Sequence, residues 1–141
     1  MTFSFEIITP EKVIFKDDIS EVIVPSVNGE LAILPNHASL VTKISEGLLT
    51  IKKDGKEHLL AITGGFLEVN NNKVSILADY AIRSEEIEES KAQEARKRAE
   101  KAMEEKTSDR DFALAESQFK RAILELKVAH KRRNYKNNVP S

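Results

Sequence analysis

Glycine and proline are confined almost entirely to the first half of this 141-residue chain. All five glycines occur at or before Gly65, and no proline lies between Pro35 and Pro140. Because glycine and proline mark turns and interrupt helices, the first part suits short strands and the second part suits long helices. We therefore predict two domains, residues 1–84 and residues 85–141.

Charge follows the same division. The whole chain has 22 basic and 23 acidic side chains and a net charge of −1, which argues against a general nucleic-acid binder. Residues 1–84 carry 8 basic and 11 acidic side chains, whereas residues 85–141 carry 14 and 12. The dense and nearly balanced charge of the second part is typical of solvated helix faces.

Several classes of chemistry lack the residues they need. The chain has no cysteine, which excludes disulfides, thiolate zinc sites and cysteine nucleophiles. His37, His58 and His130 are scattered, and neither a phosphate loop nor a dinucleotide fingerprint occurs. We expect no catalytic residue and no metal site. The pattern around His58 predicts a structural residue of a strand. His37 lies in a predicted turn, where it either holds the turn by hydrogen bonds or contacts a partner.

No apolar run approaches the ~20 residues that a membrane helix needs. The first residues also lack the basic-then-apolar order of a secretory signal, and no arginine-rich transit segment is present. These features predict a soluble cytoplasmic protein.

Alternating apolar residues and regular turn signals predict strands in the first domain. Asn28-Gly29 and Asp54-Gly55 favour hairpins, because these residue types tolerate positive φ. Gly64-Gly65 reads as a tight turn followed by a core aromatic, Phe66. About ten short strands in a β-sandwich or barrel are expected. The clearest lie at residues 3–7, 12–15, 19–24, 31–34, 40–44, 48–52, 58–63, 66–69 and 73–77.

The second domain is predicted to be an antiparallel helical hairpin. Its first helix begins at Ser84 as N-cap and ends near Glu105; the second follows a turn at residues 106–111 and ends near Arg132. Thr107, Ser108 and Asp109 are candidate caps for the second helix. The apolar positions recur every three or four residues, at Ala92, Ala95, Ala99, Ala102, Phe112, Ala115, Phe119, Ala122, Leu126 and Ala129. Such a narrow seam is marginal alone, so we expect the hairpin to rest on the sandwich or on another protein.

Residues 24–38, with the sequence VPSVNGELAILPNHA, resemble the epsilon subunit of the bacterial rotary ATP synthase. The opening residues 5–10 and Gly64-Gly65-Phe66 fit the same family, and the resemblance covers essentially the whole chain. It implies a noncatalytic central-stalk, or rotor, subunit that couples proton-driven rotation of the c ring to ATP synthesis. In this family the sandwich binds the gamma subunit and the c-subunit ring. The hairpin lies compact or extends toward the catalytic alpha/beta hexamer, where it inhibits ATP hydrolysis.

The resemblance also implies residue roles. Residues 30–38 match the loop that faces the c ring, which makes Glu30, Pro35, Asn36 and His37 candidate contacts. Basic side chains of the second helix are candidates for inhibitory contacts with an acidic loop of the beta subunit. These are Arg121, Lys127, Lys131, Arg132 and Arg133.

Some family members bind ATP at the hairpin through the pattern Ile/Leu-Asp-x-x-Arg-Ala. Here Glu88 replaces the aspartate and Lys91 replaces the arginine, while Arg98 and Arg121 match further basic positions. Glu125 stands where some ATP-binding members have arginine. Lysine lacks the planar fork of arginine, and a carboxylate repels phosphate. ATP binding, the sole cofactor role considered, is therefore expected to be weak or absent.

Two other classes of function remain as alternatives. A free-standing adaptor or chaperone would also combine a sandwich with a binding hairpin. An enzyme with its active site on residues 30–37 would lack a nucleophile, a metal set and a cofactor fingerprint. Within the family, the sequence favours a bacterial subunit on the cytoplasmic side of the cell membrane, with no direct membrane contact. A plastid-encoded homologue stays open.

Overall fold

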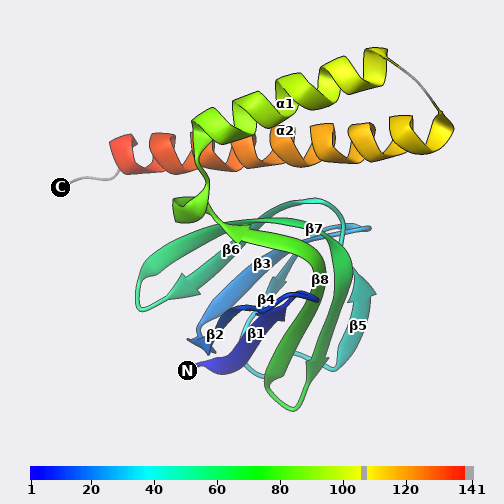
Figure 1. Ribbon diagram of the computed structural model, residues 1–141. Coiled ribbons are helices and arrows are strands. Elements are labelled where there is room, and N and C mark those ends of the chain that lie inside the picture. Colours follow the sequence, from blue (N-terminus) through cyan, green and yellow to red (C-terminus); the bar gives the residue numbers. More distant parts are fainter. Residues whose placement is uncertain (106–107, 139–141) are drawn as a thin grey trace. The chain divides into compact units, whose positions relative to one another are not determined.

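The structure, a computed structural model, describes residues 1–105 and 108–138, with side chains as far as residue 134. The chain divides into two compact units, Met1–Arg83 and Ser84–Ser141. Strands make up the first unit and helices the second (Figure 1). The turn residues Lys106 and Thr107, one of the candidate caps, lie outside the described residues.

The first unit is a single eight-stranded sheet that folds over on itself as a sandwich (Figure 1). Its hydrogen-bonded order is β2-β1-β8-β7-β6-β3-β4, and β5 pairs with β7. All pairs are antiparallel except β1 with β8. The predicted sandwich is confirmed, with eight strands instead of about ten. The strands are β1 (Phe3–Ile8), β2 (Val13–Ile19), β3 (Glu21–Ser26), β4 (Gly29–Ile33), β5 (Leu40–Lys43), β6 (Gly47–Lys53), β7 (Lys56–Asn70) and β8 (Lys73–Arg83).

The expected turn at Gly64-Gly65 is wrong, because both glycines lie inside the 15-residue strand β7. Pairing with β8 continues on both sides, from Thr63 opposite Tyr80 to Gly65 opposite Ala78. The glycines have φ values of +61° and +120°, which L side chains rarely adopt. They bend the strand without reversing it.

Phe66 is not the core aromatic that we expected, since it is 57% exposed. The next residue, Leu67, is buried, so the alternation along this half of β7 directs Phe66 outward. On the edge of β7 opposite β8, the bend coincides with a change of partner strand. There β5 and β6 lie end to end along β7, and between them the Ile44 amide donates to the Gly65 carbonyl at 2.9 Å.

Alternate side chains of the strands form the core. Phe3, Phe5 and Ile7 are buried as their period-two spacing predicts. Each such side chain stabilises the fold by roughly 1.5–3 kcal/mol relative to its exposed state. The other core residues are Phe15, Ile19, Val22, Val24, Ile33, Ile44, Leu49, Ile51, Leu60, Ile62, Leu67, Val69, Val74, Ile76, Ala78 and Ala81.

Arg83 ties the end of β8 to β2. Its Nε and Nη2 donate to the carbonyl of Ile14 at 3.2 and 3.0 Å, and its guanidinium lies 5.2 Å from the ring centroid of Phe15. The Phe15 ring also lies 5.9 Å from that of Phe5. The last residue of the sandwich is therefore held by both a cation–π contact and hydrogen bonds.

Short hairpin loops connect several strands. Asp54-Gly55 and Asn71-Asn72 both have positive φ at their two central residues, the geometry of type I′ turns. The hairpin predicted at Asn28-Gly29 is present, although Val27 and Asn28 are its two loop residues. The turn residues thus set the register of these pairs.

The second unit contains η1 (Ser84–Glu86), α1 (Glu89–Glu104) and α2 (Asp109–Asn138). The predicted start of the first helix is wrong. Ser84 opens a 3₁₀ turn, in which its carbonyl accepts from Ile87, and Glu88 is the N-cap of α1. The helix after the turn is capped as expected, because Ser108 Oγ accepts from the Asp111 amide at 3.1 Å. It continues to Asn138 instead of ending near Arg132, since no glycine or proline interrupts it.

Helices α1 and α2 pack together as an antiparallel hairpin, which confirms the predicted fold of this unit (Figure 1). Small side chains allow the close approach of the two backbones. The buried alanines are Ala92, Ala99, Ala115, Ala122 and Ala129. Phe112, Phe119 and Leu126 are half-buried beside this seam, whereas Ala102 is exposed.

Replacing Gly65 with alanine should destabilise the sandwich by about 3 kcal/mol. The added Cβ would overlap the Leu77 carbonyl oxygen and lie 2.8 Å from Ala78 Cα, at a φ of +120°. Urea denaturation of the full chain measures this change. Gly55→Ala is the matched control, because its φ is +74° with no atom within 4 Å, and it should cost about 1 kcal/mol. Equal losses for the two variants would contradict the steric argument.

Candidate functional site

Glu30 and residues 35–37 do not form the single loop that the sequence suggested. Glu30 lies in β4, opposite Pro25 of β3, next to the β3–β4 turn. Residues 35–37 follow the other end of this strand. At about 3.3 Å per strand residue, the two are separated by roughly 15–20 Å along the chain. The expectation failed because the apolar residues between them pair with β3 as a strand.

The loop at residues 35–37 has a defined conformation. Asn36 has a φ of +63°, and its backbone amide donates to Asn72 Oδ1 at 2.8 Å. His37 Nδ1 lies 2.8 Å from the carbonyl oxygen of Ala38. Since a carbonyl only accepts, Nδ1 carries the proton, and a neutral His37 has its lone pair at Nε2. This histidine therefore both holds its own turn and presents a ring nitrogen.

An apolar patch lies on the outer side of β5, β7 and β8. It consists of Val41, Phe66 and Leu77, which are 71%, 57% and 59% exposed. Phe66 is opposite Leu77, and Val41 is opposite Glu68, two residues further along β7. Phe66 and Leu77 are direct neighbours, and Val41 is diagonal to Phe66. Exposed apolar side chains that gather on one face are a candidate protein-binding surface. Sequence reasoning missed it because Phe66 was assigned to the core.

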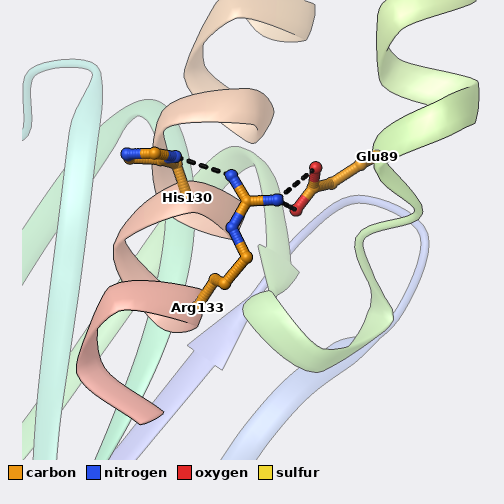
Figure 2. A network of polar contacts seen from close by, with 3 residues as sticks. All are labelled: Glu89, His130 and Arg133. Atoms are coloured by element: carbon orange, nitrogen blue, oxygen red, sulfur yellow. Dashed lines mark hydrogen bonds and ion pairs between the residues drawn. The ribbon is translucent and has the colours of Figure 1, made fainter. Parts of the chain in front are cut away.

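The basic end of α2 is engaged within the hairpin. Arg132 Nη1 donates to the carbonyl of Ser84, and Arg133 Nη1 lies 3.2 and 3.3 Å from the two carboxylate oxygens of Glu89. Arg133 Nη2 also donates to His130 Nδ1 at 2.8 Å (Figure 2). We call these contacts of Arg132 and Arg133 with Ser84 and Glu89 the hairpin latch. The sequence showed the arginines but not their partners.

The remaining basic candidates are distributed along α2. Lys127 and Lys131 are exposed and one helical turn apart, so their ammonium groups share one side of the helix. Arg121 is exposed nearly two turns before Lys127. The structure therefore brings Arg132 and Arg133 together at the latch but spreads the other three cations over the solvent face.

The candidate ATP residues are only partly brought together. Lys91 Nζ pairs with Glu88 at 3.3 Å, so these two side chains offset each other's charge. Arg98 is seven residues further along α1, on the same face and about 10 Å away. Arg121 belongs to α2. A phosphate bound at Lys91 would have to compete with the carboxylate of Glu88.

Other polar clusters of the described residues serve the fold. Lys53 binds the Asp17 carboxylate, which lowers the pKa of Asp17 and raises the pKa of Lys53. The ring of His58 lies 6.4 Å from that of Phe15, as expected for a strand residue. Residues 1–105 and 108–138 contain no group of three or more His, Asp or Glu that could hold a metal. Within the same residues, neither helix is long and apolar enough to span a membrane.

Both units match known families. Residues 2–84 match the family described as "ATP synthase, Delta/Epsilon chain, beta-sandwich domain". Residues 85–130 match "ATP synthase, Delta/Epsilon chain, long alpha-helix domain". The chain belongs to the ATP synthase delta/epsilon chain family. This confirms the resemblance seen in the sequence, and with it a noncatalytic subunit of the ATP synthase complex instead of a free-standing adaptor or an enzyme.

Individual relatives of the delta/epsilon family span nearly the whole chain. The ATP synthase epsilon chain of Herpetosiphon aurantiacus is 44% identical over 134 residues, which cover 95% of this chain and 98% of the relative. The epsilon chain of Desulforamulus reducens is 41% identical over 128 residues, with 91% and 97% covered. Both domains are therefore shared with full-length epsilon chains.

Solved structures share the fold at lower identity. A chain in the structure of the Euglena gracilis mitochondrial ATP synthase, OSCP/F1/c-ring, has a TM-score of 0.68 and 20% identity. The match covers 81% of the Euglena gracilis chain and 95% of this chain. A chain of the Tetrahymena thermophila central stalk/c-ring structure has a TM-score of 0.57 and 16% identity, covering 95% of that chain and 89% of this one.

Proposed function

We propose that this delta/epsilon chain works in the central stalk of a proton-translocating ATP synthase, on the cytoplasmic side of a bacterial membrane. Its sandwich binds the gamma subunit and the c-subunit ring, and its hairpin restrains ATP hydrolysis by the alpha/beta hexamer. The observation that carries the proposal is the match of both domains to epsilon chains over almost their full length. The solved relatives, which come from an OSCP/F1/c-ring assembly and from a central stalk/c-ring assembly, support this placement.

The apolar patch Val41, Phe66 and Leu77 is the proposed surface for gamma. A rotor subunit must hold its partner through rotation, and apolar burial supplies binding without needing exact charge alignment. Lys43 is opposite Phe66 and Glu68 is opposite Val41 in the β5–β7 pairing, so charged side chains lie among the apolar ones.

The c-ring contact is assigned to the residues that the family motif marks, Glu30 and Pro35, Asn36 and His37. Glu30 lies near the start of β4 and residues 35–37 follow its end, so we assign them to two different contacts. The two ends therefore make separate contributions to stalk assembly.

Glu30→Gln and His37→Ala should each weaken binding of the full chain to an ATP synthase complex that lacks this subunit. A loss of about threefold to tenfold in affinity is expected for a polar contact at an interface. Surface plasmon resonance on the immobilised complex would measure it. Glu46→Gln, an exposed acidic residue between β5 and β6, is the control and should bind normally. An unchanged affinity for either test variant removes that residue from the interface.

Inhibition by the hairpin would use the same arginines that form the latch. An acidic loop of the beta subunit offers carboxylates to Arg132 and Arg133, which Ser84 and Glu89 hold in the packed hairpin. The two sets of partners compete, since each guanidinium can be fully engaged in only one of them. Partly exposed ion pairs contribute only about 0–1 kcal/mol each, so the competition stays close to balance.

Neutralising Glu89 and neutralising the arginines should have opposite effects on ATP hydrolysis. Glu89→Gln weakens the latch but leaves the arginines charged, so inhibition should increase, by about twofold. The triple variant Lys131→Gln, Arg132→Gln, Arg133→Gln removes the inhibitory charges and should relieve inhibition. The steady-state ATPase rate of the reassembled complex measures both.

Glu116→Gln is the matched control for this experiment. It removes a carboxylate from an exposed ion pair of 3.4 Å with Lys120 that lies wholly within α2. Its ATPase rate should therefore equal that of the unmodified complex. An unchanged rate for the triple variant would remove the basic cluster from inhibition, and an unchanged rate for Glu89→Gln would remove the latch.

ATP is the one small ligand that the family suggests, and we propose that the hairpin binds it weakly or not at all. The Glu88–Lys91 pair supports this, because lysine offers one point charge where arginine offers a fork. Isothermal titration of the full chain should show no binding at micromolar ATP. The double variant Glu88→Asp, Lys91→Arg restores the family pattern and should bind at least tenfold more tightly. Micromolar affinity in the unmodified chain would contradict the proposal.

A further inference from the structure

Asn72 connects three segments that are far apart in the sequence. Its side-chain Oδ1 accepts from the backbone amide of Asn36 at 2.8 Å, and its Nδ2 donates to the carbonyl of Thr2 at 3.0 Å. Its own carbonyl accepts from the amide of Ser4 at 3.2 Å. The partners lie 36, 70 and 68 positions away along the chain. Asn72 thus joins the loop at residues 35–37 to the start of β1.

The orientation of this side-chain amide is fixed by its partners. The Asn36 amide can only donate and the Thr2 carbonyl can only accept, so Oδ1 must face the first and Nδ2 the second. A flipped amide would place two donors together and two acceptors together. Both ends are therefore used, and the half-buried Asn72 side chain has one orientation that satisfies them.

The backbone around Asn72 is held as firmly as its side chain. Asn72 has a φ of +61° in the two-residue turn between β7 and β8, and Asn36 has a φ of +63° in the loop it contacts. Asparagine is among the residues that tolerate this left-handed conformation. The β7–β8 pairing begins directly at Asn70 and Lys73, so the turn is anchored on the longest strand pair of the sandwich.

We infer that Asn72 is a positioning residue for the stalk-contacting loop at residues 35–37. The Asn72 side chain accepts a hydrogen bond from the backbone amide of Asn36 and so holds the bend at Asn36. This bend fixes the position of the next residue, His37. The role of Asn72 is to reduce the number of loop conformations before binding, which lowers the ordering cost of association. The inference rests on the proposed contact of this loop with a stalk partner, because Asn72 itself need not touch the partner.

The matched pair Asn72→Gly and Asn71→Gly tests the inference. Glycine accepts positive φ at both positions, so the type I′ turn is retained in both variants. Asn72→Gly removes the bonds to Asn36 and Thr2, whereas Asn71→Gly removes an exposed side chain from the same turn. Any difference between the two variants therefore reports on the Asn72 side chain and not on the turn.

Two measurements on the full chain decide the outcome. Amide hydrogen exchange followed by NMR should show about tenfold faster exchange at Asn36 in Asn72→Gly and no change in Asn71→Gly. Affinity for the ATP synthase complex that lacks this subunit should fall about threefold to tenfold for Asn72→Gly only. Urea denaturation accompanies both, because a merely structural residue would lower the midpoint and leave the affinity of the folded chain unchanged.

His37→Ala separates failure of this inference from failure of the proposed function. If His37→Ala weakens binding but Asn72→Gly does not, the loop contacts its partner and Asn72 has no positioning role. Unchanged exchange at Asn36 in Asn72→Gly also overturns the inference. If His37→Ala and Asn72→Gly both bind normally, the proposed contact of the loop is wrong, and the positioning role of Asn72 falls with it.

Discussion

The pairing of β7 with β8 is the contact on which the rest of the sandwich depends. It runs from Leu60 opposite Arg83 to Asn70 opposite Lys73, through a bend at two glycines. The end at Asn70 and Lys73 carries the Asn71-Asn72 turn, and the end at Leu60 and Arg83 places Arg83 over the ring of Phe15. Both partners of β7 on its other edge, β5 and β6, follow the same bend. A change that straightens this strand pair would therefore alter the core, the apolar patch and the loop together.

The helical hairpin is stabilised by different interactions from those of the sandwich. Its seam consists mainly of alanine, so each buried residue removes little apolar surface from water. The polar contacts of the hairpin latch, made by Arg132 and Arg133, therefore contribute a larger share of the stability than they would beside a seam of large apolar side chains. Such contacts are easily exchanged for others of the same chemistry. An element held in this way can respond to a partner whose carboxylates compete for its arginines.

Local signals predicted most of the elements. The alternation of Phe3, Phe5 and Ile7, the Asp54-Gly55 turn and the three-four spacing of the alanines each indicate structure over a few residues. All were confirmed, except that Ala102 of the alanine series is exposed. The Gly64-Gly65 pair misled because positive φ allows both a turn and a bend. Only the partner strand β8, which is distant in sequence, decides between these two outcomes.

The contacts that organise the candidate sites are long-range and could not be read from the sequence. No residue close to Asn36 in the sequence indicates that the Asn72 side chain accepts a hydrogen bond from the Asn36 amide. Likewise, no residue close to Arg133 in the sequence selects Glu89 over other carboxylates. The sequence marked which loop and which helix end to consider, and their contacts with partners stay predictions. It grouped Glu30 with His37 in one loop, although the strand predicted at residues 31–34, seen as part of β4, separates them.

The parallel pairing of β1 with β8 has a consequence for how the chain acquires its structure during synthesis. Phe5 lies opposite Val74 and Ile7 opposite Ile76, so β1 can pair early with β2 but gains its second neighbour, β8, only nearly 70 residues later. Contacts of such high sequence separation slow folding. The backbone groups on that edge of β1 are paired only after β8 has been synthesised. The helical hairpin, whose contacts are more local, comes last and is expected to form quickly once it emerges.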